Sequence, residues 1–335
     1  MLGSRRIVVT GLGTICPNGN RTAESWENVV AGRSGIGPLE HFDCSQYPTR
    51  IIGAIKNFDP LRLVDVKELR KMDRFIQYAL AAGIEAFEDS GLRIDEGNAG
   101  RCGALIGSGI GGIGFLEACY DVYRNTGATR RMSPFTGPGS NISMAAGHLS
   151  MRLGLRGPSY GLMAACSTST HAIGLAARAI AYGDADVMLA GGTEAASTPT
   201  SIGGFCAARA LSQRNDEPEK ASRPFDRDRD GFVISDGAAV VVLEEFEHAR
   251  RRGARIYAEL LGFGATSDAY HITSPREDGE GGVDAMRRAL ADAGLNPADI
   301  GYINAHGTAT RVGDLAETIA MKKAFGELAR RIPCS

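Results

Sequence analysis

The sequence has 335 residues, 43% of them hydrophobic, which is enough to bury a core over about two domains or one duplicated domain. Its 37 Lys and Arg residues nearly balance 39 Asp and Glu residues, and a net charge of -2 gives no basic field for binding nucleic acid. No apolar run approaches the length of a membrane span, and the first residues lack a signal-peptide pattern, so no membrane is expected as a partner.

The cysteines point to a reducing compartment. There are 7 of them, an odd number, and none forms a CxxC pair. This pattern argues against both a disulfide framework and a zinc site. We therefore predict a cytoplasmic protein with no structural metal.

Short apolar runs alternate with helical patterns along the chain, which is typical of α/β layering. The predicted strands cover residues 6–11, 102–107, 160–166, 186–191, 238–244, 256–262 and 300–305. Amphipathic helices are predicted over 74–90 and 283–293, ended by Gly91 and Gly294 in the C′ position.

An internal similarity suggests a duplication. The segments 86–92 and 289–295 share the same order of small, apolar and acidic residues, and each leads through a short polar loop to an apolar strand. So long a repeat favours two related α/β halves over a solenoid. We predict a first half over 1–250 and a second over 251–335.

Three motifs resemble functional sites that their surroundings do not support. Residues 107–112 fit the dinucleotide pattern GxGxxG, but the acidic residue expected about 20 positions later is missing. Residues 157–161 fit the GxSxG pattern of serine hydrolases, yet Ser159 precedes an apolar strand where the nucleophile should follow one. Residues 226–231 begin like a calcium loop, but Gly237 stands where a bidentate Glu is required, so we predict an ion-paired loop over 223–236.

Cys166 is the candidate nucleophile. An apolar strand leads to it, small hydroxyl residues follow it, and an amphipathic helix begins there. The free N–H groups and positive dipole end of a helix N-terminus favour thiolate over thiol. Cys166 is therefore predicted to be a usable nucleophile at neutral pH.

His306 is the candidate acid/base residue, because it lies at the exit of the predicted strand 300–305 between small and hydroxyl residues. The carboxyl ends of strands face the ligand crevice of an α/β sheet, so His306 and Cys166 are predicted to share a site. His171 is predicted to point away from the thiolate, and His148 and His271 either to be structural or to support the site from behind the reacting residues.

At these segments the chain resembles the β-ketoacyl-acyl-carrier-protein synthases of the I/II type, most closely type II. The resemblance rests on Ala-Cys-Ser-Thr-Ser at 165–169, His-Gly-Thr-Ala-Thr at 306–310 and Ser-Arg-Pro-Phe-Asp at 222–226, and it extends over the whole chain. It implies a thiolase-like duplicated α/β fold in α-β-α-β-α layers. The intact Cys166 disfavours the chain-initiation factors, which lack the nucleophile.

The resemblance also implies roles for individual residues. Cys166 would carry the acyl chain as a thioester, with its own N–H as an oxyanion donor, and His306 would stabilise the enolate formed when malonyl-ACP loses CO₂. Thr308 and Thr310 would bind the phosphopantetheine arm, and Ile110 would line the acyl pocket. Asp314 and Glu317 would support the polar network. This chemistry needs no cofactor.

The same resemblance implies partners. Lys67, Arg70 and Lys71, together with Arg209, match positions that meet the acidic acyl carrier protein. The family forms homodimers by continuing a sheet across a two-fold axis, and we predict the strand at 186–190 as the joining edge.

In the family, a lysine, a second histidine and a Gly-Phe-Gly-Gly turn follow the position at which this sequence ends, Ser335. We therefore expect an incomplete second half and a chain that does not complete the condensation cycle. The main function predicted is fatty-acid chain elongation. The alternatives are a polyketide-type ketosynthase and a noncatalytic ketosynthase fragment, with a serine hydrolase disfavoured.

Overall fold

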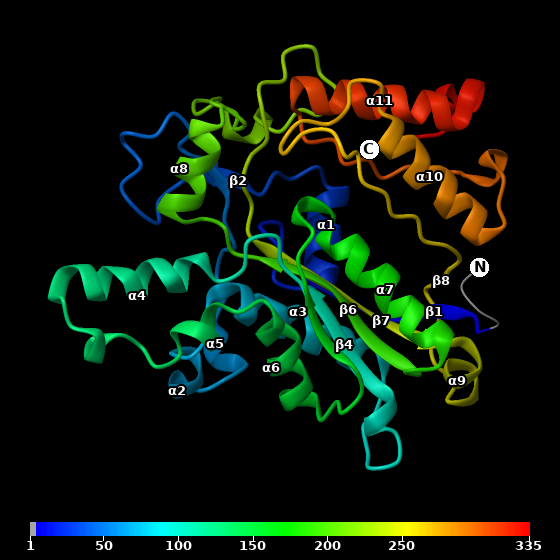
Figure 1. Cartoon of the computed structure of the whole chain (residues 1–335), viewed down its shortest axis with the longest axis horizontal. Helices are drawn as coiled ribbons and strands as arrows, with labels where there is room; N and C mark the ends of the chain where they lie inside the picture. Colours follow the sequence, from blue (N-terminus) through cyan, green and yellow to red (C-terminus); the bar gives the residue numbers. More distant parts are fainter. Residues whose placement is uncertain (1–4) are drawn as a thin grey trace.

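A six-stranded mixed sheet forms the centre of the computed structural model, which describes residues 5–335 (Figure 1). The strands lie in the order β5-β4-β6-β7-β1-β8. Their bounds are β1 Ile7–Ile15, β4 Cys102–Gly107, β5 Ser159–Leu162, β6 Val187–Glu194, β7 Gly237–Glu245 and β8 Ala258–Leu260. Strand β4 pairs in parallel with β5 and β6, whereas the β6–β7, β7–β1 and β1–β8 pairs are antiparallel. A separate two-stranded sheet contains β2 Ile36–Pro38 and β3 Ile51–Gly53.

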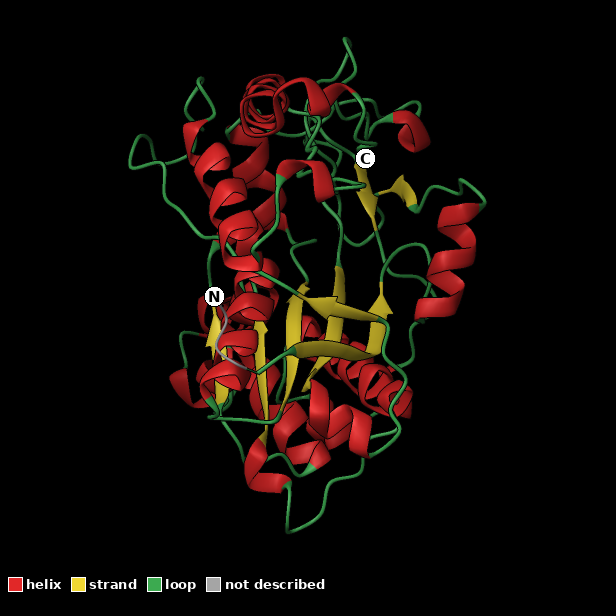
Figure 2. Cartoon of the chain, turned by 90° about the vertical axis from the view of Figure 1, so that its right-hand side faces the viewer, coloured by secondary structure: helices red, strands yellow, loops and turns green. Residues whose placement is uncertain are grey.

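Helices cover both faces of the six-stranded sheet, as Figure 2 shows from the side. These are α3 Arg74–Ser90 and α6 Ser143–Leu153 on one face and α7 Thr168–Tyr182 on the other. Side chains alternate along β6: Val187 and Leu189 pack with α3, whereas Met188 and Ala190 pack with α7. The strand is thus buried on both faces, as its continuous apolar run requires.

Two glycines of β1 let α3 lie directly on the sheet. A Cβ at Gly11 would lie 2.1 Å from the carbonyl oxygen of Ala86, and one at Gly13 would lie 1.9 Å from that of Ala82. No larger residue fits either position without moving the helix. The N-terminal Thr-Gly-Leu-Gly segment is therefore a packing surface for α3.

The remaining helices surround this core. They are α1 Thr22–Val30, α2 Val66–Leu69, α4 Ile113–Thr126, α5 Thr136–Ser140, α8 Pro199–Ala207, α9 Phe246–Arg251, α10 Glu280–Ala293 and α11 Arg311–Phe325. Across residues 5–335, none of the helices has the length and apolar character that crossing a membrane requires.

The predicted helix ends are confirmed. Helices α3 and α10 end at Gly91 and Gly294, whose φ angles of 64° and 68° are in the left-handed region that glycine adopts without strain. The predicted strand at 300–305 is wrong, because only Ile303 forms a bridge, parallel to Cys334. After α9 the described residues add β8 to the first sheet and build no second sheet. The division at residue 250 stays a prediction.

Two further strand predictions need correction. The strand predicted over 160–166 ends at Leu162, so Cys166 lies beyond the sheet in a 3₁₀ turn, Ala165–Ser167. Residues 187–190 of the segment predicted as a joining edge, 186–190, lie in β6 between β4 and β7, where both sides are already hydrogen-bonded. The edge strands of the sheet are β5 and β8.

Candidate active site

Cys166 lies in the tight connection between β5 and α7, exposed at the surface. Ala165 before it has a φ of 47°, which strains a residue other than glycine. The side chain of Thr168 holds the turn, because its Oγ1 accepts from Ala164 N at 2.8 Å and donates to Ala165 O at 2.6 Å. This fixed turn presents the sulfur at the N-terminus of a 15-residue helix.

His306 and Cys166 lie close enough for each to shift the other's pKa. Hydrogen bonding with His306 lowers the pKa of Cys166, although partial desolvation acts in the opposite direction. The same interaction raises the pKa of His306, again against partial desolvation. The pair therefore favours thiolate and imidazolium, and the helix N-terminus adds to the stabilisation of thiolate.

A carboxylate holds the backbone around His306. Glu317 accepts from His306 N at 2.7 Å and from Gly307 N at 2.9 Å. The side chains of Thr308 and Thr310 hydrogen-bond each other through their Oγ1 atoms at 3.0 Å. The histidine loop is therefore organised from α11, although no regular strand leads into it.

Asp314 joins this loop to a second one. Its side chain is 1% exposed; Oδ2 accepts from Phe225 N at 2.7 Å and lies 3.4 Å from Arg229 Nε. Arg229 also donates to Thr310 O at 3.0 Å. The loop predicted as ion-paired over 223–236 thus packs on the His306 segment. Within residues 5–335, no group of three or more His, Cys, Asp or Glu side chains is arranged to hold a metal.

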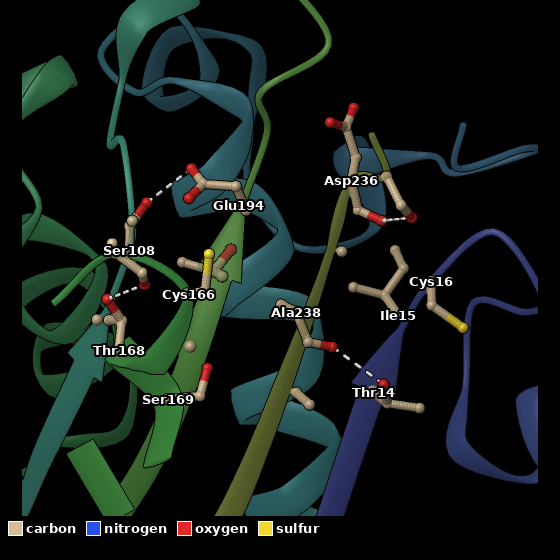
Figure 3. A pocket seen from close by; sticks show the side chains of 18 residues that line it. Thr14, Ile15, Cys16, Ser108, Cys166, Thr168, Ser169, Glu194, Asp236 and Ala238 are labelled. Atoms are coloured by element: carbon tan, nitrogen blue, oxygen red, sulfur yellow. Dashed lines mark hydrogen bonds between the residues drawn. The ribbon is translucent and has the colours of Figure 1, made fainter. Parts of the chain in front are cut away.

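A cavity of about 440 Å³ opens beside Cys166 (Figure 3). The carboxyl ends of β4 and β6 contribute Ser108 and Glu194, and Asp236 precedes β7. Burial raises the pKa of both carboxyl groups. None of these three residues is predicted as a site residue from the sequence, although Ser108 and Glu194 have the same signal as Cys166 and His306, a polar side chain close to a strand exit.

Other predicted site residues lie outside this cavity. Ile110 packs in a separate apolar cluster with Phe205 and Phe232. Lys67 and Arg70 are exposed on and next to α2, whereas Lys71 pairs with Glu68 and lies over the ring of Phe135. Arg209 is exposed after α8, which Figure 1 shows well separated from α2. Arg209 therefore does not lie next to Lys67, Arg70 and Lys71 in the structure.

The disfavoured motifs have structural explanations. Ser159 is the first residue of the edge strand β5, not a nucleophile elbow. The glycine turn at 107–112 joins β4 to α4, but its Ile110 N–H donates to Glu194 at 3.0 Å. The carboxylate of Glu194 therefore already accepts from the backbone N–H that a phosphate would need. His171 is held by Ser167 O at 3.0 Å and contacts the ring of Phe263.

Comparison with known proteins decides the family. The beta-ketoacyl synthase N-terminal domain model matches residues 4–249, and the C-terminal domain model matches 257–335. This chain belongs to the beta-ketoacyl synthase family. As a member it is an acyltransferase with the thiolase-like fold.

Individual relatives agree. The chain is 55% identical over 326 residues to 3-oxoacyl-[acyl-carrier-protein] synthase 2 of Vibrio cholerae, covering 97% of this chain and 78% of the relative. It is 47% identical to the synthase 2 of Staphylococcus aureus, covering 100% and 80%.

Solved structures share the fold. A beta-ketoacyl synthase from Burkholderia phymatum has a TM-score of 0.89 at 35% identity, over 96% of this chain and 79% of that one. A type II PKS ketosynthase, bound to a hexaketide and in complex with its acyl-carrier protein, has a TM-score of 0.89 at 34% identity, over 98% and 80%.

Proposed function

We propose that this beta-ketoacyl synthase elongates acyl chains in fatty-acid synthesis by condensing malonyl-ACP with an acyl group held on Cys166. The observation that carries the proposal is the placement of Cys166 at the N-terminus of α7 beside His306, whose interaction with the thiol lowers its pKa. Lowering that pKa supplies the nucleophile that acyl transfer requires.

In the first half-reaction, the Cys166 thiolate attacks the thioester carbonyl of acyl-ACP. The bond to Cys166 forms first and gives a tetrahedral intermediate, which then expels the carrier's sulfur. That sulfur takes the proton of the His306 imidazolium and leaves as the carrier thiol. The exposure of Cys166 allows a carrier-bound acyl group to reach it. The backbone N–H of Cys166 would donate to the oxyanion of the tetrahedral intermediate.

In the second half-reaction, malonyl-ACP loses CO₂ and leaves an enolate. His306 would donate an N–H to the developing oxyanion, held in place by the backbone contacts of Glu317. The enolate carbon then attacks the Cys166 thioester and displaces the sulfur. The product is a β-ketoacyl-ACP two carbons longer, and the thiolate is regenerated.

The paired hydroxyls of Thr308 and Thr310 suit the pantetheine arm, because each can turn from its neighbour toward an amide of the ligand. Asp314 has the supporting role, since it fixes the backbone of Phe225 and the position of Arg229. Ile110 stays our candidate for a residue that lines the acyl pocket. With the apolar cluster to which it belongs, beyond the 108–111 turn, it would limit the size of the acyl group.

The closer similarity to the synthase 2 relatives, at 47–55% identity, favours fatty-acid elongation over a polyketide role. Supplying saturated acyl-ACPs and poly-β-keto acyl-ACPs in parallel tests this choice. Measuring acyl transfer and malonyl-ACP decarboxylation separately also determines whether the 335-residue chain performs both half-reactions. We propose a cytoplasmic location, which cell fractionation tests.

Acyl carrier protein is the proposed partner, and its docking surface includes Lys67 on α2 and Arg70 directly after it. Neither side chain forms an ion pair with another described residue, so their charges are available to an acidic partner. We expect K67E/R70E to slow association with acyl-ACP roughly tenfold at low salt, with the difference shrinking as salt is added. Stopped-flow association rates measure this.

The matched control is K322E, which reverses an exposed charge on α11, on the opposite side of Figure 1. K322E changes the net charge by as much as either single variant, K67E or R70E, so equal slowing by K322E and by these single variants would show that only net charge matters. Including R209E determines whether Arg209 acts with α2 despite its separation.

We also propose a homodimer, formed along the edge strand β5. Residues 159–161 are exposed there, and the Tyr160 side chain is 55% exposed. Pairing with a second copy would satisfy the open edge. Light scattering at micromolar concentration is expected to give twice the chain mass of 35.4 kDa. A mass of one chain would contradict the proposal.

A further inference from the structure

Glu194, the last residue of β6, has its carboxylate in the glycine turn beside Cys166 (Figure 3). Oε1 accepts from Ser108 Oγ at 2.9 Å and Oε2 from Ile110 N at 3.0 Å. Ser108 Oγ in turn accepts from Gly111 N at 2.9 Å. The turn at 108–111 is therefore built around one carboxylate.

This turn supports the backbone that carries the nucleophile. A Cβ at Gly109 would lie 2.9 Å from Glu194 Oε2 and 3.3 Å from Ala165 O. Gly109 is thus enclosed between the carboxylate and Ala165, the residue with positive φ directly before Cys166. Movement of the turn would release the contact with Ala165.

We propose that Glu194 is a positioning residue for Cys166, acting through the 108–111 turn and the backbone of Ala165. The role rests on the proposed function, since it concerns the sulfur that receives the acyl group. It assigns a purpose to a half-buried carboxylate that the chemistry above does not use.

The carboxylate also has an electrostatic effect that can be separated from its geometric one. The charge of Glu194 raises the pKa of Cys166, against the larger effect of His306. Asp236 lines the same cavity, but its carboxylate is held by Ser197 through the backbone N and Oγ. A glutamine at 194 removes the charge but keeps the shape of the side chain: its oxygen can accept from Ile110 N, and its NH₂ group can donate to Ser108 Oγ in place of accepting from it. An alanine removes both contacts.

The test compares E194A, E194Q and D236N in the 335-residue chain. Two rates are measured: transfer from acyl-ACP to Cys166, and iodoacetamide alkylation of Cys166 across pH. We expect E194A to lose roughly tenfold to a hundredfold in acyl transfer, since a small misplacement of a reacting group has effects of that size. E194Q should stay within about threefold of the parent and move the alkylation midpoint to lower pH. D236N, the matched loss of a buried carboxylate, should leave that midpoint in place.

A folded E194A that acylates at the parent rate would overturn the positioning role, as would equal losses in E194A and E194Q. If E194A does not fold, S108A replaces it: slower acyl transfer at an unchanged melting temperature supports the role, and a parental rate overturns it. If the parent's own Cys166 takes no acyl group, the proposed function fails instead. The two failures are thus distinguishable.

Discussion

Replacing Cys166 by serine is expected to reduce formation of β-ketoacyl-ACP by roughly 10³-fold or more, because the nucleophile and its helix N-terminus act as a unit. The hydroxyl of serine does not ionise near neutral pH, so neither His306 nor the start of α7 can generate an anion from it. Product formation from acyl-ACP and malonyl-ACP, followed by mass spectrometry, measures the effect.

The control is C44S. Cys44 is half-buried, and its Sγ donates to Leu39 O at 3.4 Å, a contact that a serine hydroxyl can keep. We expect C44S to behave as the parent. Retention of condensation in C166S, or its loss in C44S, would place the nucleophile elsewhere.

Replacing His306 by alanine is expected to slow decarboxylation of malonyl-ACP by roughly 10²–10³-fold, the typical effect of removing one donor to a developing oxyanion. It should also move the pH midpoint of Cys166 alkylation upward. The sign follows from the hydrogen bond, which lowers the pKa of Cys166. Without that bond less thiolate is present at neutral pH, so alkylation there becomes slower.

Histidine 41 provides the matched control, since His41 is exposed and lies outside the lining of the Cys166 cavity. H41A should leave both the decarboxylation rate and the alkylation midpoint unchanged. A normal decarboxylation rate in H306A would remove His306 from the mechanism. An unchanged alkylation midpoint would remove it from the activation of Cys166.

The centre of the candidate site could be predicted from sequence because local patterns and one topological rule were sufficient. Cys166 precedes a clear amphipathic helix, and His306 follows an apolar run. Because functional residues lie preferentially at the carboxyl ends of strands in an α/β sheet, both residues are expected at the same end of the strands. The contact between them is found in the structure even though residues 300–305 form no regular strand.

Features that depend on neighbours in space could not be predicted in this way. The strand predicted over 160–166 ends early because β5 pairs with β4 only as far as Leu162, and Ala165 then turns with positive φ. Residues 300–305 have the apolar pattern of a strand but only Cys334 as a bridge partner. An apolar pattern shows that a segment can be a strand, whereas a strand requires a neighbour.

The prediction of 186–190 as the dimer edge is wrong for a similar reason, because the sequence of one strand does not determine its place in the strand order. A signal did exist: the unbroken apolar run of β6 is typical of a strand buried on both faces, which is rarely an edge. Glu194 was missed because it ends that run in a Gly-Gly-Thr-Glu segment with no known motif. Its importance lies in contacts with Ser108 and Ile110, more than 80 residues earlier.

The most direct test of the central claim is peptide mapping of the chain after brief incubation with acyl-ACP alone. The Cys166–His306 pair predicts one acyl group in thioester linkage on the peptide that contains Cys166, removable by neutral hydroxylamine. It also predicts that malonyl-ACP discharges this group as β-ketoacyl-ACP. An acyl group on another residue, or none on Cys166 in a folded chain, would contradict the account.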